Sequence, residues 1–233
     1  MIKGMFSRPE NGKMYWKEFM RQCSEIGIGS LGIVAIISVF IGAVSTIQTA
    51  YQLVSPLIPP STIAQIVRDT VILEFAPTLV CIVLAGVVGS KIASELGNMR
   101  VSEQIDALEI MGINTKTYLI LPKIVAALVV VPMLVVLSMV LGIWGGRLAG
   151  SMANILSGYT YDKGLLESFV PYNVIFALIK SYAFAFIIAS ISAYHGYFVK
   201  GGALEIGKAS TKAVVISCIL ILFSDYVLSA LLL

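Results

Sequence analysis

The sequence predicts an all-α polytopic membrane protein, in which an N-terminal interfacial amphipathic helix precedes five transmembrane helices. Of its 233 residues, 58% are hydrophobic and only 12% are charged, whereas an average soluble domain has roughly 25% charged residues. The apolar residues also gather in five long runs, and about 20 apolar residues of helix are enough to cross a bilayer core of about 30 Å. The net charge of +3 is too small to indicate nucleic-acid binding.

The first expected element is the amphipathic helix, within a cytoplasmic or interfacial segment of residues 1–25. Tyr15 and Phe19 share one helical face, and basic residues recur every four positions from Lys13 to Arg21. Helices that lie in the membrane surface, with their polar face in water, have this pattern.

The five transmembrane helices follow in one permease domain, residues 26–233. Their predicted limits are approximately 26–54, 63–93, 118–150, 172–199 and 213–233. With the N-terminus in the cytoplasm, 12 of the 16 lysine and arginine residues lie at the inner ends of the spans, as the positive-inside rule requires. The C-terminus is then expected on the outer, periplasmic side.

The connection between the second and third spans, at about residues 94–115, is unusually polar for this chain. Four of the 13 acidic residues fall there within fifteen positions, at Glu95, Glu103, Asp106 and Glu109. The spacing predicts a helix over Val101–Met111, with Gly112 as the glycine that ends it.

This helix would separate its apolar residues from its acidic ones. The apolar side consists of Val101, Ile105, Leu108 and Met111. Helices that rest on a membrane usually have a basic polar face, and anionic headgroups repel an acidic one. We therefore favour docking to a cytoplasmic partner protein, and a helix that lies on the membrane surface is the alternative.

The residues from Glu74 to Gly112 resemble the MlaE family, the permease subunits of ABC transporters that work with MCE proteins. The closest part is ELGNMRVSEQIDALEIMG, which ends at Gly112. Similar motifs follow in the family's order, namely LGIWGG at Leu141–Gly146, LIKS at Leu178–Ser181 and DYVLSAL at Asp225–Leu231. The resemblance extends from Gly27 onward.

The resemblance implies a homodimeric permease in a bacterial inner membrane, with two copies of a cytoplasmic ABC ATPase and an MCE-domain protein in the periplasm. The implied substrate is phospholipid or a related lipid. No cofactor is expected in this chain, because ATP and Mg belong to the ATPase. The residues expected to couple the chain to the ATPase are Glu95, Gly97, Arg100, Glu103, Asp106, Glu109, Met111 and Gly112.

Three ionisable residues, Glu74, Lys180 and Asp225, lie inside predicted spans. Each costs at least about 2.5 to 3.5 kcal/mol on insertion scales, so each indicates a function or a buried pair. Counting along the helices places all three at one depth, in the outer half of the membrane. They either form a structural ion pair that ties helices together or border a cavity that holds a lipid headgroup, and the two roles are compatible.

The outer end of the first span supplies further polar residues, which are either edges of the same lipid pocket or ordinary interfacial residues. They are Gln48, Thr49, Tyr51 and Gln52.

A second functional class is an ion-coupled secondary carrier, in which Glu74, Lys180 and Asp225 relay a proton or bind an ion. Many such carriers contain internal repeats with paired broken helices, and the sequence has no such repeat.

Two glycine motifs resemble nucleotide sites, and neither fits one. Gly27, Gly29 and Gly32 spell G-x-G-x-x-G at the start of an apolar helix, where small residues indicate close helix packing. The segment Gly202–Lys208 matches G-x-x-x-x-G-K, but Ala209 stands where a magnesium-binding Ser or Thr is needed. ATP is therefore expected on a separate subunit, and the sequence supports neither catalysis nor a metal site in this chain.

Overall fold

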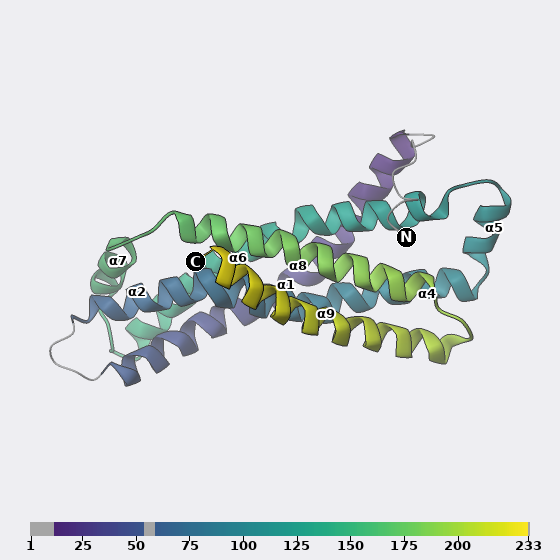
Figure 1. Cartoon of the computed structure of the whole chain (residues 1–233). Coiled ribbons are helices and arrows are strands. Elements are labelled where there is room, and N and C mark those ends of the chain that lie inside the picture. Colours follow the sequence, from purple (N-terminus) through teal and green to yellow (C-terminus); the bar gives the residue numbers. More distant parts are fainter. Residues whose placement is uncertain (1–11, 54–58, 233) are drawn as a thin grey trace.

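The computed structural model describes residues 12–53 and 59–232, and every regular element within these ranges is a helix (Figure 1). Five helices are long and apolar enough to cross a membrane, which confirms the predicted number of spans. They cover Met14–Gln52, Ser61–Val101, Lys116–Met152, Tyr172–Tyr197 and Ala203–Leu232. Most of them extend beyond the predicted limits, because the helices continue into the polar residues at their ends.

The first span belongs to helix α1, Gly12–Gln52, which contains both the amphipathic segment and the first apolar run. The boundary expected after residue 25 is not a break in the helix. No proline lies between Gly12 and Gln52, and isolated glycines lower helix stability by only about 1 kcal/mol each.

The second span is one continuous rod in which the α-helix is interrupted by two π-helical segments. It runs through α2 (Ser61–Thr70), the π-helical segment η2 (Val71–Leu79), α3 (Val80–Leu84), a second π-helical segment η3 (Ala85–Gly89) and α4 (Ser90–Val101). Pro77 lies inside η2. A proline has no N–H and its ring collides with the carbonyl four residues earlier, so the wider π turn accommodates it, and such turns are frequent at functional sites.

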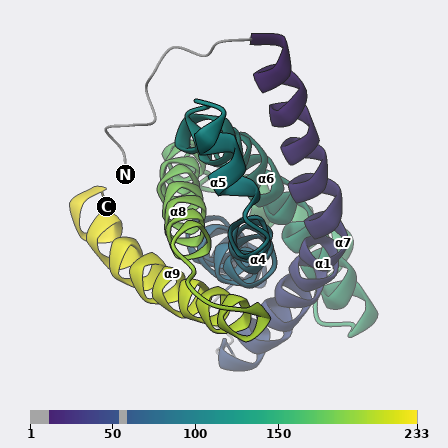
Figure 2. The same cartoon turned by 90° about the vertical axis from the view of Figure 1, so that its right-hand side faces the viewer.

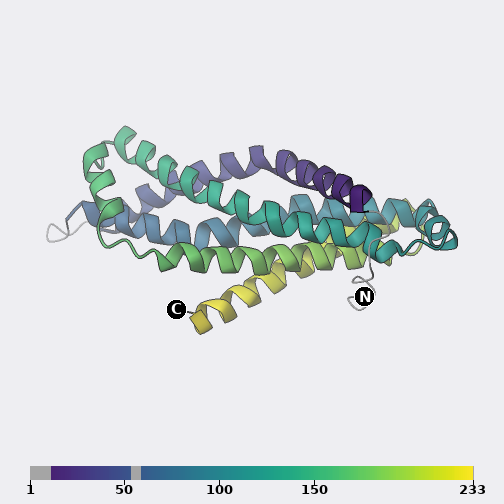
Figure 3. The ribbon, with the colours of Figure 1, turned by 90° about the horizontal axis from the view of Figure 1, so that it is seen from above.

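The remaining elements complete a bundle with two distinct ends (Figures 1 and 3). In chain order they are α5 (Gln104–Ile110), η4 (Lys116–Ile120), α6 (Leu121–Met152), α7 (Gly158–Leu166), α8 (Tyr172–Tyr197) and α9 (Ala203–Leu232). One end holds α5 and the α8–α9 connection, and the other holds α7, the end of α1 and the start of α2. We call these the α5 end and the α7 end.

The core lies between the second span, α6 and α8, with α1 and α9 on its outside (Figure 2). Leu84, Ile120 and Phe184 are among its fully buried side chains. The C-terminal half of α9 diverges from the bundle (Figure 2), and its Phe223 and Tyr226 are exposed.

Helices α1 and α6 are in close contact through glycines, and the tightest contacts involve other glycines than those expected from the sequence. A Cβ atom on Gly42 would overlap the backbone of Gly142, and one on Gly145 would overlap that of Val39. Of the glycines expected to pack closely, Gly27 lies at ordinary contact distance from Val130 of α6, whereas Gly29 and Gly32 face open space within this chain. The close contact thus uses the glycines of the LGIWGG motif, because they lie where α1 and α6 cross.

Candidate functional site

Lys180, Glu74 and Asp225 meet inside the bundle, although they come from three different spans. The Lys180 Nζ atom lies 2.9 Å from Glu74 Oε1 and 2.7 Å from Asp225 Oδ1. The Thr78 hydroxyl donates a hydrogen bond of 3.1 Å to the same Asp225 oxygen. We call these four residues the Lys180 cluster, and it ties η2, α8 and α9 together.

The backbone of η2 explains part of this arrangement. In an α-helix, the carbonyl of Leu73 would accept a hydrogen bond from residue 77, but Pro77 has no N–H to donate. Lys180 Nζ lies 3.2 Å from that carbonyl oxygen and donates to it. The ammonium group also lies 4.7 Å from the centroid of the Phe176 ring, a favourable cation–π distance.

The three ionisable side chains differ in exposure. Lys180 is fully buried, the Asp225 side chain is 17% exposed and the Glu74 side chain is 44% exposed. Buried charges need partners of opposite sign, and Lys180 has two. Glu74 therefore belongs to the buried pair on one side and faces the surroundings of the chain on the other.

The polar residues at the end of α1 are not joined to this cluster. Gln48, Tyr51 and Gln52 are exposed, and among the described residues no hydrogen bond or ion pair connects them to Lys180, Glu74 or Asp225. Their part in a lipid pocket stays a prediction.

The polar connection between the second and third spans forms a short helix, α5, at one end of the bundle (Figure 1). It begins at Gln104 rather than at Val101, because Glu103 has a left-handed backbone with φ of 59° that separates α4 from α5. Gly112 ends the helix as predicted, with φ of 80°. The Ile113 N–H donates to the Leu108 carbonyl over 3.1 Å, as in a Schellman motif.

Only half of the predicted apolar face of α5 turns inward. Ile105 is fully buried and Leu108 packs against the core, whereas Val101 and Met111 are exposed. Ile110, which was not predicted as part of this face, is 87% exposed. An exposed apolar tip on a short helix at the end of a bundle is a suitable contact for a partner protein.

Two sets of side chains hold α5 in place. Arg100 and Asp106 form an ion pair of 2.6 Å. The Tyr197 hydroxyl donates a hydrogen bond of 2.8 Å to Glu109 Oε1, and the Thr115 hydroxyl donates one of 3.1 Å to the same atom. The Tyr197 hydrogen bond is the main cause that lowers the pKa of Glu109, and it links α5 directly to α8.

Two of the expected coupling residues, Glu95 and Gly97, lie on α4 and face inward rather than toward a partner. The Glu95 carboxylate is 2.5 Å from the buried Lys123 Nζ atom of α6 and 3.6 Å from Arg21 of α1. Gly97 is buried, and a Cβ atom there would come within 3.1 Å of Ile206 on α9. These residues join α4 to its neighbours.

Arg68 has a structural role that the sequence does not reveal. It is 2% exposed, and it donates hydrogen bonds to the backbone carbonyls of Leu165 (2.7 Å), Glu167 (2.8 Å) and Ser168 (3.3 Å). The side chain thus fastens α2 to the end of α7 and to the residues that follow it. No sequence pattern indicates this contact, because its acceptors are backbone atoms far along the chain.

Comparison with known proteins agrees with this architecture. The family model described as Permease MlaE matches residues 19–231. A "Probable ABC transporter permease protein" of Rickettsia bellii (strain RML369-C) is 39% identical over 94% of this chain and 84% of its own length.

Two further relatives have more specific names. The protein "TRIGALACTOSYLDIACYLGLYCEROL 1, chloroplastic" of Arabidopsis thaliana is 32% identical over 94% of this chain and 62% of its own length. The "Intermembrane phospholipid transport system permease protein MlaE" of Haemophilus influenzae is 28% identical over 99% of this chain and 88% of its own length. From the family match over residues 19–231 and these relatives, we conclude that this chain belongs to the MlaE permease family.

Proposed function

We propose that this chain is the permease subunit of an ABC transporter that moves phospholipid, or a related lipid, between a bacterial inner membrane and a periplasmic MCE-domain protein. The observation on which this rests is the match to the MlaE permease family over nearly the whole chain. The Haemophilus relative, by its name, acts in intermembrane phospholipid transport. ATP and Mg would bind to a separate cytoplasmic ATPase, which drives the movement.

In this proposal the Lys180 cluster borders the lipid site. Charged groups inside a membrane protein usually face the bundle interior or a substrate path. The ion pairs of Lys180 with Glu74 and Asp225 fix η2, α8 and α9, while the partly exposed Glu74 carboxylate remains available to a headgroup. The exposed apolar residues of α9 would pack on lipid or on a second copy, and pairing of two copies would enclose more volume than five helices can.

Helix α5 would receive the movement of the ATPase and pass it on by two routes. One route is α4, which is continuous with the rod that contains Glu74. The other is the hydrogen bond from Tyr197 to Glu109, because Tyr197 ends the helix that contains Lys180. Glu74 and Lys180 are thus both connected to α5, so a shift of α5 would change the geometry of their ion pair.

The test is a charge placed on the exposed tip of α5. Ile110→Asp should prevent co-purification of the ATPase and stop ATP-driven lipid transfer in reconstituted vesicles, because Ile110 is 87% exposed and a buried unpaired carboxylate is costly at an interface. Leu166→Asp is the matched control, since Leu166 is 83% exposed at the α7 end.

An ion-coupled carrier would behave differently. It would continue to transport lipid in the Ile110→Asp variant, and it would respond to a proton gradient without ATP. Full ATPase association together with full transport in that variant would contradict the proposed coupling.

A further inference from the structure

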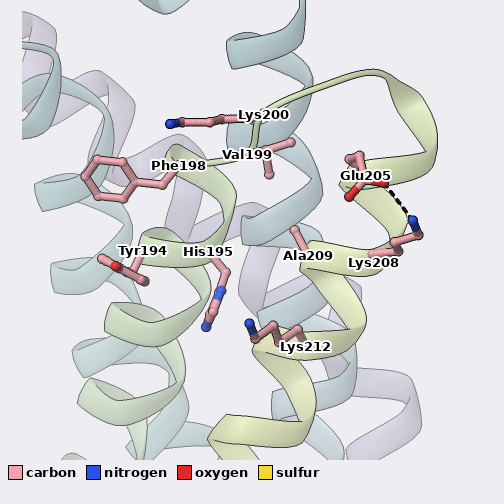
Figure 4. A pocket seen from close by; sticks show the side chains of 9 residues that line it. All are labelled: Tyr194, His195, Phe198, Val199, Lys200, Glu205, Lys208, Ala209 and Lys212. Atoms are coloured by element: carbon pink, nitrogen blue, oxygen red, sulfur yellow. Dashed lines mark hydrogen bonds and ion pairs between the residues drawn. The ribbon is translucent and has the colours of Figure 1, made fainter.

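A polar pocket lies between the end of α8 and the start of α9, away from the Lys180 cluster. It has a volume of about 360 Å³. The aromatic and basic side chains that line it are Tyr194, His195, Phe198, Lys200, Lys208 and Lys212 (Figure 4). His195 and Lys180 are 15 positions apart on the same helix, which corresponds to about 22 Å along its axis. The pocket is therefore a separate site.

The residues that line the pocket have more positive than negative charge. Lys208 is paired with Glu205 over 2.7 Å, whereas Lys200 and Lys212 form no ion pair with any residue that the structure describes. With His195 neutral, the lining has a net charge of +2. Lys212 lies beside the His195 ring, close enough for the two to interact electrostatically (Figure 4). An anion between these cations would relieve their mutual repulsion.

The position of the pocket identifies the source of the anion as a lipid. Tyr194 and Phe198 are 50% and 48% exposed at its edge, and exposed aromatic residues of this kind are typical of membrane interfaces. Beyond Lys212, the exposed Val215 and Ile219 continue the same face of α9, because residues three and seven positions later recur on one side of a helix. A phosphate at Lys212 could thus lie beside acyl chains that run along these two residues.

We propose that this pocket binds the phosphate of an anionic phospholipid from the leaflet at the α5 end, with Lys200 and Lys212 as its principal charged contacts. Basic pockets between transmembrane helices are known to take anionic headgroups. The site goes beyond the proposed lipid-transfer path, since it contains none of the residues of the Lys180 cluster and needs no ATPase to be occupied.

The test uses His195, the only histidine in the chain, as a reporter inside the pocket. In full-length, histidine-labelled protein in a zwitterionic detergent, one imidazole signal is expected by NMR. Phosphatidylglycerol should shift this signal in a saturable manner, and phosphatidylcholine should shift it much less. The double variant Lys200→Gln/Lys212→Gln should weaken the apparent affinity for phosphatidylglycerol by about tenfold or more, as expected for the loss of two surface lysines near a membrane.

Two further variants separate this effect from general loss of charge or fold. Lys17→Gln/Lys116→Gln removes the same charge from residues outside the pocket and should leave the phosphatidylglycerol titration unchanged. Lys212→Arg keeps the charge and should retain binding, which shows that the pocket still folds when this side chain is replaced.

Four results would overturn the proposal. The first is an equal response to phosphatidylglycerol and phosphatidylcholine, and the second is an equal loss of affinity in the two double variants. The third is saturation of the His195 signal by millimolar inorganic phosphate without lipid, which would assign the site to a soluble anion. A signal that no lipid shifts, but that an acidic segment of the partner ATPase does, would also overturn it and assign the pocket to a protein contact.

Discussion

Lys180 is fully buried and has two carboxylate partners, so its removal should destabilise the protein. Lys180→Met would leave Glu74 and Asp225 close together without their cation, and breaking a buried pair in this way costs about 3 kcal/mol or more. We take the lower end of this range because Glu74 is 44% exposed. Denaturant unfolding in detergent micelles measures the loss.

A triple variant separates structure from transport at this site. Lys180→Met/Glu74→Gln/Asp225→Asn removes all three charges and should regain most of the stability, because a neutral replacement of a complete buried set is often tolerated. If the cluster contacts the lipid headgroup, this stable variant should still transfer lipid poorly. Normal transfer by the triple variant would show that the cluster is purely structural.

The meeting of these three side chains could be predicted from the sequence, because ionisable residues at one depth in a membrane have few other partners. The contact of Lys180 with the Leu73 carbonyl could not. This contact depends on the rotation of η2 relative to α8. Packing between the spans sets that rotation, and no local pattern in the sequence indicates it.

Glu109 gives a prediction with a defined pH dependence. Its pKa in the folded protein lies below the ordinary value of 4.5, chiefly because of the Tyr197 hydrogen bond. The stabilisation is therefore fully present above pH 4.5 and is lost as the pH falls through the lowered pKa. Tyr197→Phe should move the pKa of Glu109 upward, and Thr115→Val should do so less, as measured by NMR titration of the Glu109 carboxyl carbon. An unchanged pKa in Tyr197→Phe would contradict this assignment.

At the scale of helices, the contact between α1 and α6 depends on glycine. Gly42→Ala would place a methyl group on the backbone of Gly142, and overpacking of this kind costs about 1–3 kcal/mol or more. Gly32→Ala is the matched control in the same helix, because nothing lies within 4 Å of its would-be Cβ atom. It should be neutral or slightly stabilising. Equal unfolding midpoints for the two variants would show that the crossing is loosely packed.

The number and order of the spans could be predicted because each is a long apolar run, and hydropathy is read directly from the sequence. The break between α4 and α5 could not be predicted in the same way. Glu103 is not a residue that usually adopts a left-handed backbone, and the tertiary contacts of Arg100 with Asp106 and of Ile105 with the core hold it there. Gly112, in contrast, was predictable since glycine adopts positive φ without strain.

At the scale of the whole molecule, the sequence does not reveal which helices are neighbours. The pairing of α1 with α6 and the divergence of α9 follow from side-chain shape along whole helices, and from contacts between residues about 100 positions apart, such as Ser38 and Ser138. The lysine and arginine residues nevertheless divide between the two ends of the bundle as the sequence predicts. The α5 end includes Lys116, Lys200 and Lys212, and the α7 end includes Arg68 and Lys163.

This asymmetry predicts how the protein is oriented. Lysine and arginine are retained on the cytoplasmic side, so the α5 end should face the cytoplasm and the α7 end the periplasm. Ser102→Cys at the α5 end and Tyr159→Cys at the α7 end are both exposed positions. In spheroplasts, a membrane-impermeant maleimide should label Tyr159→Cys at once and Ser102→Cys only after the membrane is permeabilised. The parent chain, with Cys81 buried and Cys23 and Cys218 partly buried, gives the background. The reverse labelling pattern would place α5 in the periplasm, beyond the reach of a cytoplasmic ATPase, and would rule out the proposed coupling.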